Sequence, residues 1–236
     1  MQLRLDKFIS NNTKYSRKEV KELILENKVL VDNIVIKNPG FIITESSKVT
    51  VNNFLIQNYS NVYIILNKPK NYVCSNYDKI NPTVFELLPP NLQNIKGLHT
   101  VGRLDLDTTG LLLITNDGNF SHKLTSPKKQ LFKTYYAVLD KEIDPKIIDV
   151  FSQGFELKDF KTLPAKLKIV KSKEAILEIS EGKFHQVKRM FAKFGLKVLN
   201  LTRLKIGNFV LPKELKEGQI KLITLTQLEK QIYNKK

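Results

Sequence analysis

The chain has 236 residues, of which 42% are hydrophobic and 26% charged, as in a globular protein that buries a core. Its 39 lysines and arginines exceed its 23 acidic residues, and the net charge of +16 is typical of polyanion binders. One cysteine and three histidines exclude a disulfide framework and a cysteine-based zinc site. Because no apolar stretch could span a bilayer or serve as a signal segment, we expect a cytoplasmic protein that binds nucleic acid and no membrane.

The positive charge is not spread evenly along the chain. Residues 1–60 carry 9 basic and 6 acidic side chains, whereas residues 158–205 carry 13 basic and 4 acidic ones. A solvated lysine-rich surface is the alternative explanation. The concentration in one stretch favours contacts with phosphates over general solubility.

Residues 1–55 predict a small helical module with a short sheet. Apolar residues at helical spacing indicate a first helix, and Ser16 with Glu19 forms a capping-box pattern at the start of a second. Strands are expected at 28–37, around an Asp-Asn turn, and at 48–51. So small a module buries only a marginal core, which suggests that it serves a larger partner domain.

This module resembles the S4 RNA-binding domain. The resemblance is carried by the sequences Arg4-Leu5-Asp6-Lys7-Phe8, Ser16-Arg17-Lys18-Glu19 and Lys28-Val29-Leu30-Val31-Asp32-Asn33. A helix N-terminus with added cations suits phosphate, and the alternative for any one residue is a solvated basic helix face. The resemblance implies RNA contacts at the start of the second helix, from Lys14, Ser16, Arg17, Lys18 and Lys21.

A polar stretch, residues 56–61, predicts a linker to a second domain at 62–230, followed by a tail at 231–236. Strands dominate the second domain, and several are joined by turns too short for crossover helices. The expected fold class is α+β, with a mixed, largely antiparallel sheet flanked by helices. No glycine-rich phosphate loop of nucleotide enzymes occurs, so neither ATP nor NAD is expected as a cofactor. The expected strands of this domain are 62–66, 111–115, 133–139, 165–170, 175–179, 198–204 and 207–211, and its expected helices are a short one before Pro89, 145–151 and 184–194.

Residues 99–118 contain an arginine and two carboxylates between two glycines, directly before an apolar strand. Gly102 and Gly110 permit a tight loop that presents Arg103, Asp105 and Asp107 to a cleft. A polar loop whose aspartates only cap turns is the alternative.

Three stretches together, Gly102-Arg103-Leu104-Asp105, Lys133-Thr134-Tyr135 and residues 181–190, closely resemble the ribosomal RNA pseudouridine synthases that carry an S4 domain. The resemblance covers essentially the whole chain. Val73-Cys74-Ser75 and the sequence His185-Gln186-Val187-Lys188-Arg189-Met190 are most similar to the small-subunit (RsuA-like) branch, although this distinction is weaker than the family resemblance.

The resemblance implies that a uridine of small-subunit (16S) ribosomal RNA is isomerised to pseudouridine without a cofactor or metal. The alternatives are the same reaction on large-subunit (23S) RNA and a non-catalytic S4-containing assembly factor. A pure binder has no need of a carboxylate in a basic groove, which disfavours the second alternative. Nothing in the sequence demands more than a monomer, and free RNA and an assembling small subunit both remain possible substrates.

By the same resemblance, Asp105 is the essential carboxylate, which attacks the base or the ribose or removes a sugar proton. A nearby cation favours the ionised carboxylate, and Lys188 is preferred over its neighbour Arg189 for this role. Tyr135 is the pocket tyrosine beneath the base. A base in paired RNA must be flipped to react, and Arg103 would assist that step or fill the vacated space.

The remaining polar residues receive supporting roles. Asp107 is expected to organise the loop through backbone N–H groups, and Cys74 to be a small buried residue. His185 is expected to be structural or to contact phosphate. The basic stretches would line an RNA groove as positioning contacts, through Lys128, Lys129, Lys133, His185, Arg189 and Arg203.

Overall fold

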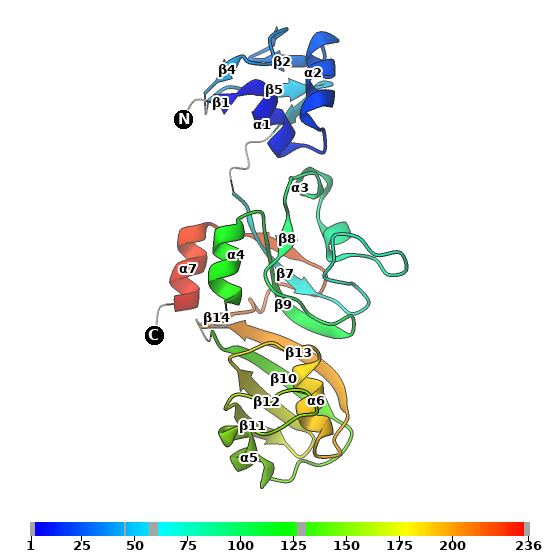
Figure 1. Cartoon of the computed structure of the whole chain (residues 1–236), viewed down its shortest axis with the longest axis vertical. Coiled ribbons are helices and arrows are strands. Elements are labelled where there is room, and N and C mark those ends of the chain that lie inside the picture. Colours follow the sequence, from blue (N-terminus) through cyan, green and yellow to red (C-terminus); the bar gives the residue numbers. More distant parts are fainter. Residues whose placement is uncertain (1–2, 45, 57–60, 127–130, 234–236) are drawn as a thin grey trace. The chain divides into compact units, whose positions relative to one another are not determined.

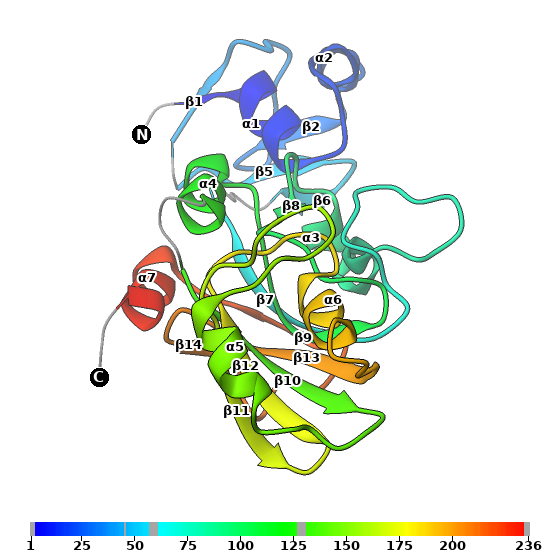
Figure 2. The ribbon, with the colours of Figure 1, turned by 60° about the horizontal axis from the view of Figure 1, so that its bottom comes forward.

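The computed structural model describes residues 3–44, 46–56, 61–126 and 131–233, and Figures 1 and 2 show it from two directions. The chain forms two compact units. The first comprises Met1–Val62 and Leu88–Leu98, and the second comprises Tyr63–Leu87 and His99–Lys236. Among the described residues, no helix is long and apolar enough to cross a membrane.

Among the described residues, the first unit contains three helices, a four-stranded antiparallel sheet and a two-stranded pair (Figure 1). The four-stranded sheet has the order β3-β2-β5-β6, and β1 pairs with β4. The elements are β1 (Leu3–Arg4), α1 (Leu5–Asn12), α2 (Arg17–Leu25), β2 (Val29–Val31), β3 (Ile34–Val35), β4 (Ile42–Ile43), β5 (Val49–Val51), β6 (Phe54–Ile56) and, from the second segment, α3 (Pro90–Gln93).

The capping box predicted at Ser16 and Glu19 is confirmed. The Ser16 hydroxyl accepts the Glu19 backbone N–H at 3.3 Å, and the Glu19 carboxylate accepts the Ser16 N–H at 2.7 Å. Helix α2 therefore begins at Arg17 and turns Val20 and Ile24, both fully buried, toward the core of this unit. Burial of these side chains supplies the main stabilisation of so short a helix.

Two tight turns of the same kind shape the small sheet. Asp32 and Asn33 have φ of 51° and 68°, and Asn52 and Asn53 have φ of 50° and 67°. Both pairs therefore adopt the left-handed conformations that a two-residue hairpin needs. The first hairpin was predicted, whereas the second was not. In it, Phe54–Ile56 pairs with β5 as strand β6, so Ile56 belongs to the sheet and not to the expected linker. Residues 57–60 of that linker lie outside the described residues.

The second unit is built on one nine-stranded mixed sheet (Figures 1 and 2). Its order is β11-β12-β10-β13-β9-β7-β15, with β14 paired to β13 and β8 to β9. Strands β9 and β13 run parallel, and the other described pairs are antiparallel, which confirms the expected sheet. The strands are β7 (Tyr63–Lys68), β8 (His99–Thr100), β9 (Thr108–Thr115), β10 (Lys133–Leu139), β11 (Lys166–Lys171), β12 (Glu174–Ile179), β13 (Val198–Ile206), β14 (Phe209–Val210) and β15 (Ile220–Leu222).

Four α-helices and one 3-10 helix flank this sheet: η1 (Val84–Leu87), α4 (Gly118–Thr125), α5 (Ile147–Gln153), α6 (Gln186–Ala192) and α7 (Leu225–Tyr233). Helix α4 was not predicted from its basic sequence. It begins where the Asp117 carboxylate accepts the Phe120 N–H at 3.0 Å. Helix α7 continues through Ile232, which is 1% exposed, so the predicted tail at 231–236 starts too early.

The two faces of the sheet have different uses. Leu111 and Leu113 of β9 join Phe120 of α4 and Leu228 of α7 in one hydrophobic core, and the two helices lie side by side in Figure 1. Successive side chains of a strand point to opposite faces. Thr108 of β9 therefore faces the opposite side, where it lines a cleft.

Candidate active site

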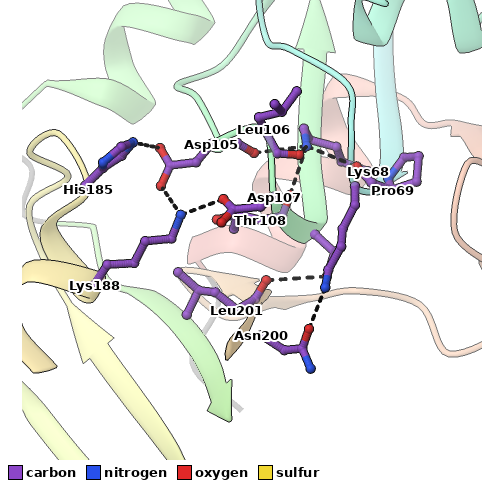
Figure 3. A network of polar contacts seen from close by, with 12 residues as sticks. Lys68, Pro69, Asp105, Leu106, Asp107, Thr108, His185, Lys188, Asn200 and Leu201 are labelled. Carbon is purple, nitrogen blue, oxygen red and sulfur yellow. Dashed lines mark hydrogen bonds and ion pairs between the residues drawn. The ribbon is translucent and has the colours of Figure 1, made fainter. Parts of the chain in front are cut away.

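A buried lysine holds the loop between β8 and β9 in place. Lys68, at the end of β7, has no solvent exposure, and burial lowers its pKa. Its ammonium group donates to backbone carbonyl oxygens at 2.9 to 3.3 Å (Figure 3), and these belong to Pro69, Asp105, Leu106 and Thr108. Since three of the four carbonyls belong to the predicted loop, one side chain determines its path.

Backbone constraints add to this attachment. Gly110 has φ of 100°, and a Cβ atom there would lie 2.4 Å from the carbonyl oxygen of Arg203. Only glycine allows β9 and β13 to approach so closely at this point. On the other side of the loop, the Leu104 N–H donates to the Cys74 sulfur at 3.4 Å, so the expected buried cysteine also supports the loop.

Two carboxylates of the loop share one ammonium group. Lys188 Nζ lies 3.3 Å from Asp105 Oδ2 and 2.5 Å from Asp107 Oδ1 (Figure 3). Burial alone would raise the pKa of Asp107, but the Lys188 hydrogen bond and charge outweigh it and lower that pKa. Asp107 also accepts a hydrogen bond from its own backbone N–H, and its ion pair with Lys188 is a further contact that the sequence did not predict.

Helix α6 explains why Lys188 and its neighbour Arg189 have different partners. Adjacent residues of a helix point about 100° apart. Lys188 points to Asp105, whereas Arg189 forms an ion pair with Asp159. The structure thus brings the preferred cation to the carboxylate and directs Arg189 away from it.

The cleft above the loop is partly open to solvent and has a cavity volume of about 60 Å³. Tyr135 of β10 is 7% exposed and contributes to its wall, as do Asp105 and Lys188. Arg103 also lines the cleft, is exposed, and makes no side-chain hydrogen bond or ion pair with the residues that the structure describes. The cleft therefore brings one carboxylate, one cation and one phenol together on its lining.

His185 lies closer to the carboxylate than expected. Its Nε2 atom is 3.6 Å from Asp105 Oδ1 (Figure 3), and its side chain is 42% exposed. Its backbone is left-handed, with φ of 50°, immediately before α6. The sequence places a histidine in the motif, but only the turn into the helix brings its ring to Asp105.

Two expected RNA contacts are corrected by their burial. Arg203 is 4% exposed, and its Nε donates to the Leu111 carbonyl at 2.7 Å, so it lies beneath the sheet surface and not in a phosphate groove. Its Nη2 and the Thr108 hydroxyl have no hydrogen-bond partner among the described residues. Lys133 is half-buried and donates to the Ser180 carbonyl at 3.3 Å, and burial lowers its pKa. Each lies two positions from a cleft residue on its own strand, Lys133 from Tyr135 and Arg203 from Leu201, so both point to the same face of the sheet as the cleft but are covered there.

The other expected RNA contacts belong to the first unit or lie outside the residues that the structure describes. Lys128 and Lys129 lie outside the described residues. The Ser16 hydroxyl is already used in the capping box. The five residues expected to contact RNA around the start of α2 all have exposed side chains: Lys14, Ser16, Arg17, Lys18 and Lys21.

Lys68 is the main residue that the sequence reasoning missed. The available signal was a lysine directly before Pro69, at the end of a strand in which every residue is buried. A lysine in such a position needs several acceptors. Its partners, however, are loop carbonyls about 40 positions away, and no sequence pattern shows them.

Comparison with protein families places these features in a known group. Residues 62–193 match the model of the RNA pseudouridylate synthase family, and residues 3–53 match the model of the S4 domain. The chain belongs to the RNA pseudouridylate synthase family. It is therefore an isomerase, and the family resemblance inferred from Gly102–Asp105 and the stretch at 181–190 is confirmed.

Relatives of this synthase match it along almost its whole length. "Ribosomal small subunit pseudouridine synthase A" of Vibrio cholerae is 42% identical, over 94% of this chain and 96% of the relative. The proteins of the same name from Vibrio parahaemolyticus and Escherichia coli K12 are 43% and 39% identical, over 96% and 94% of this chain and 98% and 96% of theirs. A solved structure described as a pseudouridylate synthase superposes with a TM-score of 0.69 at 38% identity, covering 98% of this chain and 100% of that one.

Proposed function

We propose that this synthase converts one uridine of small-subunit ribosomal RNA into pseudouridine in the cytoplasm, with Asp105 as its catalytic carboxylate. The observation that carries the assignment is the contact between Asp105 and Lys188 at 3.3 Å, at the side of a cleft that Tyr135 also lines. The small-subunit substrate is supported by relatives of that name that are 38% to 43% identical.

The reaction is an isomerisation whose atoms balance without a co-reactant. The bond between uracil N1 and ribose C1′ breaks, the base rotates, and a bond forms between uracil C5 and C1′. The proton lost from C5 is balanced by a proton gained at N1. The protein must therefore hold a base that is briefly detached and provide groups that assist bond cleavage and proton transfer.

Each cleft residue suits one of these tasks. Lys188 forms an ion pair with Asp105 and fixes the carboxylate where it would face the sugar and base. Tyr135 supports the flat face of the uracil, and its phenol is the cleft group suited to assist transfer of the C5 proton. Arg103, which has no described side-chain partner, is free to enter the space left by the flipped nucleotide.

The test is to map pseudouridines in ribosomal RNA from cells that lack the protein and from cells complemented with variants. We expect one small-subunit uridine to lose its modification in the deletion strain. Wild-type protein and Asp149→Asn, a matched change at an exposed position on α5, should restore it, whereas Asp105→Asn should not. In vitro, Asp105→Asn should lower kcat by at least about 10³-fold, because removing a reacting group has effects of this order.

Three results would contradict the proposal. A changed site in large-subunit RNA would reassign the substrate. Full restoration by Asp105→Asn would show that this carboxylate is not needed for catalysis. If the deletion strain lost no pseudouridine, the protein would bind RNA without modifying it. Comparing naked 16S transcript with assembling subunits as substrates decides which of the two the enzyme modifies.

A further inference from the structure

Beside the cleft lies an exposed aromatic ring that the reaction described above does not use. Phe184, immediately before His185, is 75% exposed. Its ring stacks on the His185 imidazole, with centroids 3.7 Å apart and planes at 20°. His185 in turn lies 3.6 Å from Asp105 (Figure 3). A stack of two rings therefore leads from solvent to the candidate carboxylate.

The backbone holds this stack in an unusual conformation. His185 has φ of 50° and ψ of 26°, a left-handed conformation that residues with side chains adopt rarely. Such conformations persist where the surrounding structure enforces them, and they cluster at ligand-binding sites. Here, helix α6 begins at the next residue, and the Phe184 carbonyl accepts a hydrogen bond from Arg189 at 3.4 Å.

Lys183 and Arg189, which are next to Phe184 in sequence and hydrogen-bonded to its carbonyl respectively, both lie over a second ring, that of Phe160. Lys183 Nζ lies 5.9 Å from the centroid of the Phe160 ring, and the Arg189 guanidinium lies 5.0 Å from it. Arg189 is also paired with Asp159, which fixes its position. Rings interleaved with positive charge are the pattern by which proteins bind unpaired nucleic acid, since bases stack on the rings and phosphates meet the cations.

The position of Phe184 shows which nucleotide it would meet. Lys183 and His185 line the cleft, but Phe184 between them is not among the described residues that do so. Its exposed face would therefore meet a base other than the one that enters the cleft. When a target nucleotide is flipped, the adjacent base loses a stacking partner, and an aromatic side chain replaces that contact.

We propose that Phe184 is a stacking platform for the unpaired nucleobase next to the target uridine. This proposal rests on the proposed function, because it assumes that the cleft receives a flipped uridine from RNA. The platform contributes to RNA binding and to choice of the target, and it does not take part in the bond changes.

The sequence has no tryptophan, so Phe184→Trp creates a single fluorescent reporter at the site. The probes are an oligouridylate and inorganic polyphosphate, which has the charge but no bases. We expect saturable quenching by oligouridylate and little by polyphosphate. The matched control is Val170→Trp on the edge strand β11, which is 46% exposed, and it should show no quenching by either.

Substitutions that remove or keep the ring separate stacking from a structural role. Phe184→Ala should weaken binding of oligouridylate and raise KM for ribosomal RNA by roughly 5- to 150-fold, the range measured for one base stack, with kcat preserved. Phe184→Tyr should restore both values, and Phe184→Leu should not. If Phe184 only supported His185, kcat would fall instead of KM rising.

Two outcomes would overturn the proposal: quenching by polyphosphate equal to that by oligouridylate, or affinity of Phe184→Ala within about twofold of wild type. Pseudouridine formation by the wild type on the same ribosomal RNA is measured in parallel. If the wild type converts uridine while Phe184→Ala binds normally, only the platform is wrong. If the wild type converts none, the proposed function fails, and the quenching still decides whether Phe184 stacks on bases.

Discussion

The two units of this chain use positive charge in opposite ways. In the first unit, Arg17 and Lys18 at the start of α2 are exposed. Among the described residues neither forms an ion pair, although the charge of Asp6 is near enough to interact with that of Arg17. In the second unit, Lys68 is fully buried and donates hydrogen bonds to backbone carbonyl oxygens, and the ammonium group of Lys188 is shared by two carboxylates.

This contrast separates two functions of a cation near RNA. An exposed lysine or arginine gains its binding energy by neutralising phosphate and releasing counterions, so its contribution depends on salt. A buried or paired cation has already satisfied its charge within the protein, and what it contributes is geometry. Net charge of +16 therefore does not show which cations touch RNA.

The largest effect that follows from this comparison is expected at Lys68. Lys68→Met would leave loop carbonyls without a donor and let the Asp105 loop shift, so unfolding free energy should fall by about 3 kcal/mol. A displacement of about 1 Å at a reacting group lowers kcat by about 100-fold. Chemical denaturation measures the unfolding free energy. Single-turnover kinetics, at a temperature where the variant is folded, measure the rate of the chemical step.

The control for this change is Lys70→Met, since Lys70 is an exposed lysine two positions away that donates to the Asn200 side chain. It should change kcat by less than about threefold, as surface substitutions do. A folded Lys68→Met enzyme with normal kcat would show that the loop keeps its geometry without the buried ammonium group.

A smaller effect, on binding alone, is expected in the first unit. Arg17→Glu with Lys18→Glu should weaken RNA binding about tenfold at low salt and reduce the slope of log K against log salt by about 1.4, at about 0.7 for each of two lost phosphate contacts. Saturating kcat should not change. Filter binding at several salt concentrations measures the slope.

Lys28→Glu with Lys37→Glu makes the same change of charge elsewhere on this unit, at exposed positions away from the start of α2. If both double variants weaken binding equally, the effect comes from net charge and not from a site at the helix start. If the double variant Arg17→Glu with Lys18→Glu binds RNA as tightly as wild type, this helix takes no part in RNA recognition.

The smallest effect is expected from Asp107→Asn. The Lys188 contact overcomes burial and lowers the pKa of Asp107, so this group stabilises the fold above its unfolded pKa of about 3.9, and the contribution disappears as pH falls through the lower folded value. Because the side chain is 64% exposed, the gain at pH 7 is about 0.5 kcal/mol. Wild type should be slightly more stable than Asp107→Asn at neutral pH, and the two should converge in acid. A gap that persists in acid would show that charge pairing is not its cause.

Local signals in the sequence predicted much of the fold. The capping box at Ser16 and the Asp32-Asn33 turn depend on neighbouring residues alone, and both are confirmed. The Asn52-Asn53 turn carries the same kind of signal, yet the strand after it was not predicted, and its last residue, Ile56, was assigned to the linker because polar residues follow. Helix α4 was missed because its apolar positions are few, and its formation depends on packing against β9 and α7.

For the site, the sequence by itself determined the chemistry available: a carboxylate loop between glycines, a tyrosine on a strand, and a helix that carries two adjacent basic residues. The tertiary structure decided how these groups act on one another. Lys188 and not Arg189 meets Asp105, Arg203 is buried, and Lys68 holds the loop, because register, helix phase and burial are set by contacts between segments far apart in the chain. Residue type limits what a group can do, whereas distance and desolvation decide which of those possibilities it performs.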